Sequence, residues 1–96
     1  MHQRGVRVST LRRHVVRELL LRSEMRAIIL ERWAVTTSAK DRIQASVLAA
    51  YLAERMTREV SNDWRNRCRN AAAFAGFKRR CKTDGRYWIL CIKERA

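Results

Sequence analysis

Residues 61–92 read SNDWRNRCRNAAAFAGFKRRCKTDGRYWILCI, and their apolar pattern changes once, at Gly76. Before Gly76, apolar residues recur at helical spacing and form one stripe: Trp64, Cys68, Ala71 and Ala75. Ser61 is a favourable N-cap, Asp63 in the first turn suits the helix dipole, and a glycine commonly follows a helix. The pattern therefore predicts a helix over residues 62–75.

After Gly76, polar and apolar residues alternate, which is typical of strands. Two strands are expected, over 77–82 and 86–92, joined at Asp84-Gly85, a dipeptide that strongly favours two-residue hairpin turns. This turn would pair Thr83 with Arg86, Cys81 with Trp88 and Lys78 with Cys91. Cys81 and Cys91 then lie on opposite faces, so no disulfide is expected between them. The second strand is apolar on both faces, which predicts a central place in the sheet.

Upstream of this stretch the sequence is predominantly helical in pattern. Residues 1–9 are basic and without a period, so a flexible arm is expected there. Helical spacing follows over 10–22 and 24–34, either as two helices or as one bent helix. Residues 35–40 suit a loop, and Asp41 and Gln44 have the spacing of a capping box, which predicts a helix from Asp41 to about Met56. The domain itself is expected to span 24–96, preceded by an N-terminal helix over 10–23.

The charge of the chain points to an anionic partner. Among 96 residues, 22 are basic and nine are acidic, which gives a formal net charge of +13, and eighteen of the basic residues are arginine. The two ends of the sequence carry most of this excess, +5 over residues 1–35 and +7 over residues 61–96. Such a field attracts polyanions, and the planar guanidinium fork suits phosphate and guanine.

Several functional classes have no support in the residues. The three cysteines lack metal-ligand spacing, and His2 and His14 lie in the other half of the chain, so no metal and no cofactor are expected. No phosphate-binding glycine loop, carboxylate pair or nucleophile triad appears, so the chain is not expected to be an enzyme. The longest apolar run, residues 47–53, is too short to span a bilayer, and a cytoplasmic domain without membrane attachment is expected.

Three core helices followed by a basic hairpin is the element order of a winged helix-turn-helix. The expected fold is therefore mainly α with a small β-hairpin (α+β), with the helix over 62–75 in the DNA major groove. The face opposite its apolar stripe lacks acids and presents the candidate base-reading residues Asn62, Arg65, Asn66, Arg69 and Asn70. Asparagine can bind adenine N6 and N7 together, and arginine can bind guanine O6 and N7. Ala73 on the same face would allow close approach to the bases.

The hairpin supplies candidate phosphate contacts, which give affinity without sequence information. These are Lys78, Arg80, Lys82 and Arg86. Arg79 falls on the other strand face, where it is expected to stack on Trp88. Trp33, Trp64 and Trp88 are interpreted as core residues.

Four stretches lie within residues 28–95: IILERW, DRIQASVLAAYLAER, AAAFAGFKRR and DGRYWILCIK. In these stretches the chain resembles the C-terminal winged-helix domain of phage and plasmid primase-helicases of the poxvirus-like superfamily 3 type. The resemblance implies DNA binding by residues 62–70 and 78–86, without helicase or primase activity, because no Walker loop is present. The first 22 residues have no counterpart in that family, and the helix over 62–75 is unusually rich in asparagine and arginine.

The combined expectation is a DNA-binding protein of a phage or mobile element, located in a bacterial nucleoid or infected cell. It would act on double-stranded DNA as a transcriptional regulator or a replication-origin binder. The N-terminal helix would either dimerise or extend the DNA contact, and a homodimer is expected because Leu11, Val15 and Leu19 form a surplus apolar stripe. Two alternatives stay open: a protein-interaction module that docks on an acidic host or phage protein, and a nucleic-acid-binding architectural protein without sequence preference.

Overall fold

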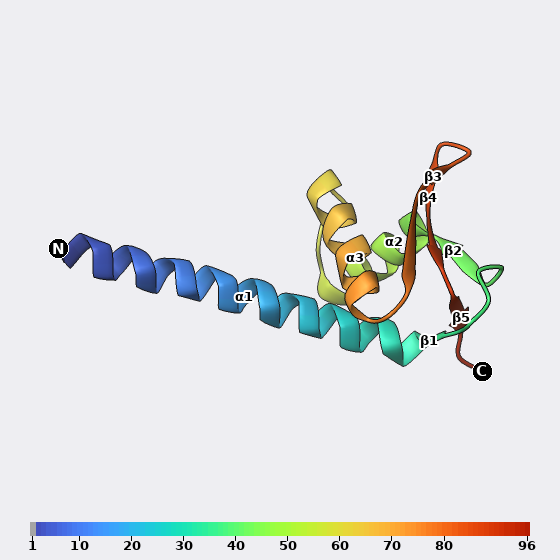
Figure 1. The fold of residues 1–96 in the computed structure, drawn as a ribbon, viewed down its shortest axis with the longest axis horizontal. Coiled ribbons are helices and arrows are strands. Elements are labelled where there is room, and N and C mark those ends of the chain that lie inside the picture. Colours follow the sequence, from blue (N-terminus) through green and yellow to red (C-terminus); the bar gives the residue numbers. More distant parts are fainter. Residues whose placement is uncertain (1) are drawn as a thin grey trace.

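The computed structural model describes the backbone of residues 2–96 and the side chains of residues 12–79 and 84–96. The fold is α+β, with three helices and two small antiparallel sheets (Figure 1). The helices are α1 (His2–Arg32), α2 (Ala45–Met56) and α3 (Asn62–Phe74). The strands are β1 (Trp33–Val35), β2 (Arg42–Gln44), β3 (Lys78–Thr83), β4 (Arg86–Leu90) and β5 (Ile92–Glu94).

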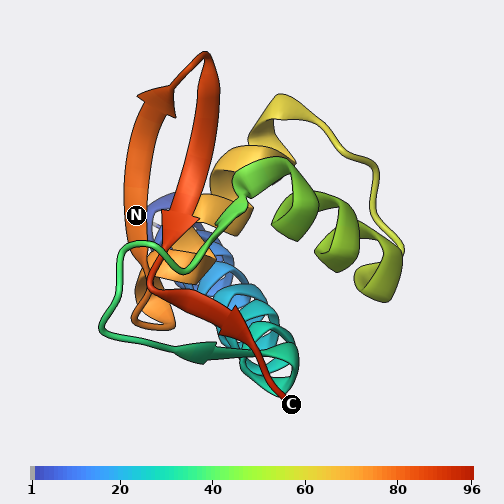
Figure 2. The same cartoon turned by 90° about the vertical axis from the view of Figure 1, so that its right-hand side faces the viewer.

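The sheets join segments that are distant in sequence. One sheet has the strand order β2-β4-β3, and the other pairs β1 with β5. Figure 2 shows the β3–β4 hairpin and α2 on either side of the molecule, with α3 between them. The core lies where the end of α1, α2, α3 and β4 meet: Met25, Ile28, Ile29, Trp33, Ala45, Leu48, Ala49, Leu52, Ala53, Trp64, Cys68, Ala71, Ala72, Phe77, Ile89 and Ile92.

The N-terminal region forms one continuous helix, which settles the alternative that the apolar pattern leaves open. α1 begins at His2, so the expectation of a flexible arm over residues 1–9 is wrong for the described residues, which begin at residue 2. Among the described residues there is also no separate additional helix, because residues 10–22 and 24–32 belong to the same element, while residues 33 and 34 lie in β1. Only Ser23 stands between the two segments, and neither proline nor glycine interrupts the helix there.

The capping box at Asp41 is not formed. Residues 42–44 pair with β4 as strand β2, in the register Arg42↔Leu90, Ile43↔Ile89 and Gln44↔Trp88. α2 therefore begins at Ala45, with Gln44 as an N-cap that makes no side-chain capping bond. The main-chain groups of 42–44 gain ladder hydrogen bonds from a strand far along the sequence, and this outweighs the local helix signal. The predicted end of this helix at Met56 is confirmed.

The predicted start of α3 is confirmed, and the helix ends one residue earlier than expected. Ser61 has extended backbone geometry, and its hydroxyl accepts a hydrogen bond of 3.0 Å from the Trp64 amide. The helix ends at Phe74, and Gly76 has a φ of +103°, in the region that favours glycine. The buried side of the helix includes Trp64 and Cys68 from the predicted stripe.

The hairpin turn is confirmed, but the register beyond it is different. Asp84 and Gly85 have φ values of 56° and 74°, as a type I′ turn requires, and Thr83 pairs with Arg86. A bulge between Arg80 and Thr83 then shifts the pairing, so that Trp88 lies opposite Arg80 and Leu90 lies opposite Lys78. The predicted pairs Cys81–Trp88 and Lys78–Cys91 are therefore wrong. β4 is central, as expected.

The single strand expected over 86–92 is interrupted at Cys91, so that two strands, β4 and β5, form in its place. Cys91 has a φ of 60°, which turns the chain out of the three-stranded sheet. Ile92–Glu94 then forms β5 and pairs with β1 directly after α1. The Arg95 amide also donates to the Arg32 carbonyl oxygen at 2.8 Å, so the C-terminal segment binds the end of α1.

Replacing Ser61 by alanine is expected to lower the free energy of unfolding by about 1 kcal/mol, because the Trp64 amide loses its acceptor. Urea denaturation followed by circular dichroism measures the change. Ser61→Asp is the matched control, since aspartate caps equally well and should keep nearly the full stability. Equal losses in both variants would contradict a capping role.

Candidate nucleic-acid interface

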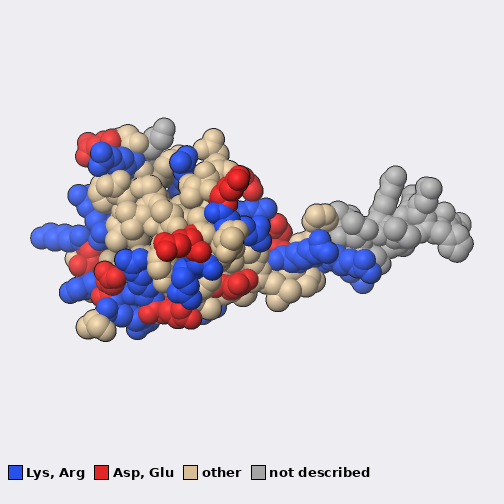
Figure 3. All heavy atoms as spheres, turned by 180° about the vertical axis from the view of Figure 1, so that it is seen from behind, with Lys and Arg blue, Asp and Glu red and all other residues tan. Residues whose placement is uncertain are grey.

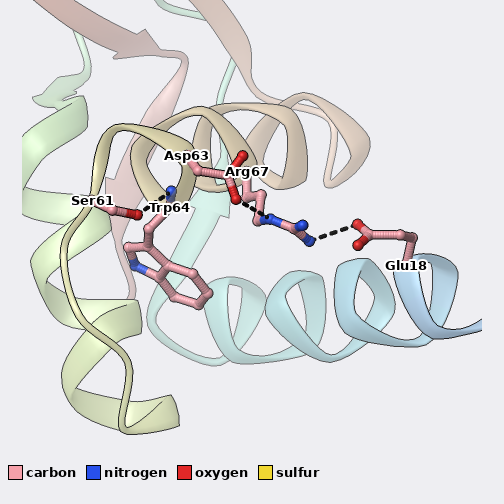
Figure 4. A network of polar contacts seen from close by, with 5 residues as sticks. All are labelled: Glu18, Ser61, Asp63, Trp64 and Arg67. Atoms are coloured by element: carbon pink, nitrogen blue, oxygen red, sulfur yellow. Dashed lines mark hydrogen bonds and ion pairs between the residues drawn. The ribbon is translucent and has the colours of Figure 1, made fainter. Parts of the chain in front are cut away.

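α3 is held in place from two sides. The Trp64 indole is buried, and its N–H donates to the Ala49 carbonyl oxygen on α2 at 3.0 Å. On the other side, Arg67 binds Glu18 of α1 at 2.6 Å and Asp63 at 3.0 Å (Figure 4). The hydrogen bond to Glu18, followed by that to Asp63, raises the pKa of Arg67 above its ordinary value. Asp63, the single acidic residue of α3, is therefore bound to Arg67 on the side of the helix that faces α1.

The opposite face of α3 is open and free of acids among the described side chains. Asn62, Arg65, Asn66 and Asn70 are exposed, and Arg69 is half-buried. Arg65 donates to the Asn62 side-chain oxygen at 3.2 Å. The five predicted base-reading residues therefore share one face, and Ala73 on this face is exposed as well.

Two of these side chains are joined to the hairpin. The Asn70 side-chain oxygen accepts a hydrogen bond of 2.6 Å from Arg79 of β3. The Arg69 guanidinium lies 4.1 Å from the ring centroid of Tyr87 on β4. These contacts orient both side chains before any ligand binds, and they fix the hairpin against α3.

The stacking predicted for Arg79 on Trp88 is not observed, because Arg79 is bound to Asn70. Arg42 of β2 stacks on Trp88 instead, with its guanidinium 4.2 Å from the ring centroid. Trp33 and Trp64 are buried as expected, while Trp88 is half-buried at the sheet surface.

The hairpin contributes exposed basic side chains on both strands. Lys78 on β3 and Arg86 at the start of β4 are exposed. The side chains of Arg80 and Lys82, two further predicted phosphate contacts, lie outside the described residues.

A cavity of about 200 Å³ lies where α3, the start of α2 and β4 meet. Its lining contains three arginines and no acid among the described residues: Gln44, Ala45, Ser46, Arg65, Arg69, Gly85, Arg86 and Tyr87. The uncapped N-terminus of α2 lies at the same place, and the first amide groups of a helix lack intrahelical acceptors. The cavity thus combines guanidinium groups with a partial positive charge, which suits an anionic oxygen group.

A larger groove, of about 720 Å³, lies between α1 and the segment that joins α2 to α3. Its charged lining residues are of both signs: Arg17, Arg58, Arg67, Glu18, Glu24, Glu59 and Asp63. This groove therefore has no excess of positive charge for a polyanion. The face seen in Figure 3 likewise carries acidic side chains among the basic ones.

Cys68 is a buried thiol in the core. Burial raises the pKa of the Cys68 thiol to about 12, which keeps it protonated and unreactive. Among the described residues, no cluster of His, Cys, Asp and Glu has the makings of a metal site. Within the same residues, none of the helices combines the length and apolar character that crossing a membrane requires.

No family model, no curated protein and no solved structure matches this chain. The arrangement of α3, α2 and the hairpin therefore carries the functional conclusion.

Three residues of this region are not singled out by sequence reasoning. The sequence pattern assigns Arg42 and Gln44 to the start of a helix, and it assigns Tyr87 a structural role in a strand. The period of two along a strand is the one signal that places Tyr87 on the same face as Ile89, the core side of the strand. The positions of Arg42 and Gln44 depend on a pairing with β4 that no local pattern encodes.

Proposed function

We propose that this chain is a winged-helix protein that binds double-stranded DNA, with α3 in the major groove and the β3–β4 hairpin as the wing. The order α1, β2, α2, α3, β3, β4 supports the fold assignment, because β2 pairs with the last strand of the wing. The observation that carries the function is the acid-free face of α3, which continues into the arginine-lined cavity below the hairpin.

Base reading is assigned to the exposed amide groups of α3. Asn66 lies at the middle of the open face, between Asn62 and Asn70. Asn70 is oriented by Arg79, and Asn62 by Arg65, so their donor and acceptor directions are partly fixed before binding. A bidentate contact of this kind discriminates by about 1–3 kcal/mol against a wrong base pair.

Backbone contacts are assigned to the cavity and the wing. A phosphate seated in the cavity would accept hydrogen bonds from Arg65, Arg69 and Arg86 and lie near the first amides of α2. Lys78 would contact a second phosphate along the wing, together with Arg80 and Lys82. Within this proposal, Arg69 serves the backbone rather than the bases, because its guanidinium is stacked on Tyr87.

The biological role proposed with this activity is transcriptional regulation or replication-origin binding for a phage or other mobile element. Either role requires a preference for a defined site over bulk DNA. Such a preference distinguishes the proposal from an architectural protein, which binds any duplex through its phosphates.

Selection of bound duplexes from a random pool tests the proposal. At about 150 mM salt, which suppresses the non-specific component, we expect enrichment of a defined motif. Binding without enrichment would indicate an architectural protein, and absence of binding to any duplex, even at low salt, would favour a protein partner.

Asn66→Ala is expected to relax the preference at one position of the enriched motif, with about 5- to 100-fold less discrimination there. The reason is that an exposed amide at the middle of the open face is lost without any loss of charge. Competition binding with single-base variants of the motif measures the change. The control is Gln3→Ala, which removes an amide from the other end of the chain. An unchanged preference in Asn66→Ala would contradict base reading by α3.

A further inference from the structure

The first two thirds of α1 project from the domain. The molecule measures 55 × 28 × 25 Å, and its long direction follows this helix (Figure 1). Residues 12–20 are all exposed, whereas Leu21, Met25, Ile28 and Ile29 pack on the domain. Isolated helices of this length are marginal in water, so most helices in proteins depend on packing of an apolar face.

The projecting segment carries four exposed apolar side chains in two turns. Val15, Val16, Leu19 and Leu20 are 58, 52, 52 and 64% exposed, and we call them the α1 quartet. At 3.6 residues per turn they occupy an arc of about 140°, and that arc lies on a different side from the residues packed on the domain. A compact apolar arc of this size on a charged helix is typical of an interaction surface.

We infer that the α1 quartet binds the same quartet of a second copy of this chain, with the two α1 helices antiparallel. A two-fold axis between Arg17 and Glu18 places Val15 opposite the partner's Leu20, and Val16 opposite the partner's Leu19. Each contact then joins a smaller side chain with a larger one, as well-packed interfaces require. The inference concerns α1 alone and is independent of DNA binding by α3.

Charge selects the antiparallel arrangement. A parallel pair would bring Arg12, which lies near the middle of the quartet arc, directly against its own copy. In the antiparallel pair, each edge of one helix faces the same edge of the other helix. Glu24 and the partner's Arg13 then lie on one shared edge, and their positions along the helix axis differ by about 3 Å. The two basic domains also lie at opposite ends of the helix pair, which limits the repulsion between two chains of +13 each.

Sedimentation equilibrium of the full chain without DNA tests the pairing. Over about 1–100 µM we expect a mass of twice 11.3 kDa at the upper end. Val16→Glu/Leu19→Glu should weaken the dimer at least about 100-fold, because two charges enter each of the two Val16–Leu19 contacts. The control is Val47→Glu/Val60→Glu, at residues that are 46 and 44% exposed outside α1. A monomeric wild-type chain, or equal dissociation of both double variants, would overturn the inference.

Cysteine cross-linking tests the direction of the helices. Arg12 and Ser23 are eleven residues apart, so both lie near the middle of the quartet arc, and the two-fold axis places each opposite the other's copy. The two variants Arg12→Cys and Ser23→Cys are prepared in a Cys81→Ser background and oxidised with diamide. Each variant alone should remain monomeric on a non-reducing gel. Their mixture should form a covalent dimer. Cross-linking of Ser23→Cys with itself, and not with Arg12→Cys, would overturn the antiparallel arrangement.

Discussion

Replacing Trp64 by alanine is expected to lower the free energy of unfolding by about 3–5 kcal/mol, a large part of the stability of so small a domain. The indole is 4% exposed between α2 and α3, and its removal leaves both a cavity and an unpaired Ala49 carbonyl oxygen. Urea denaturation followed by far-ultraviolet circular dichroism measures the change.

Trp64→Phe separates the two causes of this loss. Phenylalanine keeps most of the buried volume and removes only the N–H donor, so we expect a loss of about 1–2 kcal/mol. Equal stability of the phenylalanine and alanine variants would show that the hydrogen bond to Ala49, rather than packing, joins α2 to α3.

The second large effect is expected at the arginine-lined cavity. Replacing Arg65, Arg69 and Arg86 together by alanine should weaken duplex binding about 100- to 1000-fold near 150 mM salt, because three charged donors to phosphate are lost. The slope of log K against log salt should become shallower by about 2–3, which titrations at several salt concentrations measure.

The control for this triple variant removes the same charge elsewhere. Arg26 lies over Phe74, and Arg55 and Arg58 lie at and beyond the end of α2, all outside the cavity lining. Their replacement by alanine should change affinity less than tenfold, through the general field alone. Equal losses in both triple variants would show that net charge, and not the cavity, drives binding.

The parts of the fold that could be predicted from the sequence have local causes. The Ser61 cap acts on the amide three residues later, and Asp84-Gly85 supplies two consecutive residues that tolerate positive φ. The stripe of α3 was predictable because helical period and burial coincide over thirteen residues.

The parts that could not be predicted depend on pairing between distant segments. β1, β2 and β5 have three residues each, too few for a periodic signal, and their partners lie far along the chain. The bulge between Arg80 and Thr83 changes the register without any proline or glycine to mark it. Such features arise from main-chain hydrogen bonds that become available only when the sheet has formed.

The candidate site also has one part that could be predicted from the sequence and one part that could not. The open face of α3 was predictable, because it is the complement of the apolar stripe on one helix. The cavity was not, because β2, α2, α3 and β4 all contribute to its lining. The stacking of Arg42 on Trp88 and of Arg69 on Tyr87 likewise joins residues of different elements.

The junction between α1 and the C-terminal strand has a mechanical consequence. Arg32 binds Glu94 at 2.9 Å, and Arg95 donates to the Leu30 carbonyl oxygen at 2.7 Å, so the end of the helix is fixed to β5, the strand that follows the wing. The free part of α1 acts as a lever of about 30 Å. Because this lever starts where the helix leaves the domain, a tilt of the domain by about 5° displaces the tip by about 3 Å, half a helical turn. A small change in the orientation of the domain is therefore a large displacement at the opposite end of the molecule.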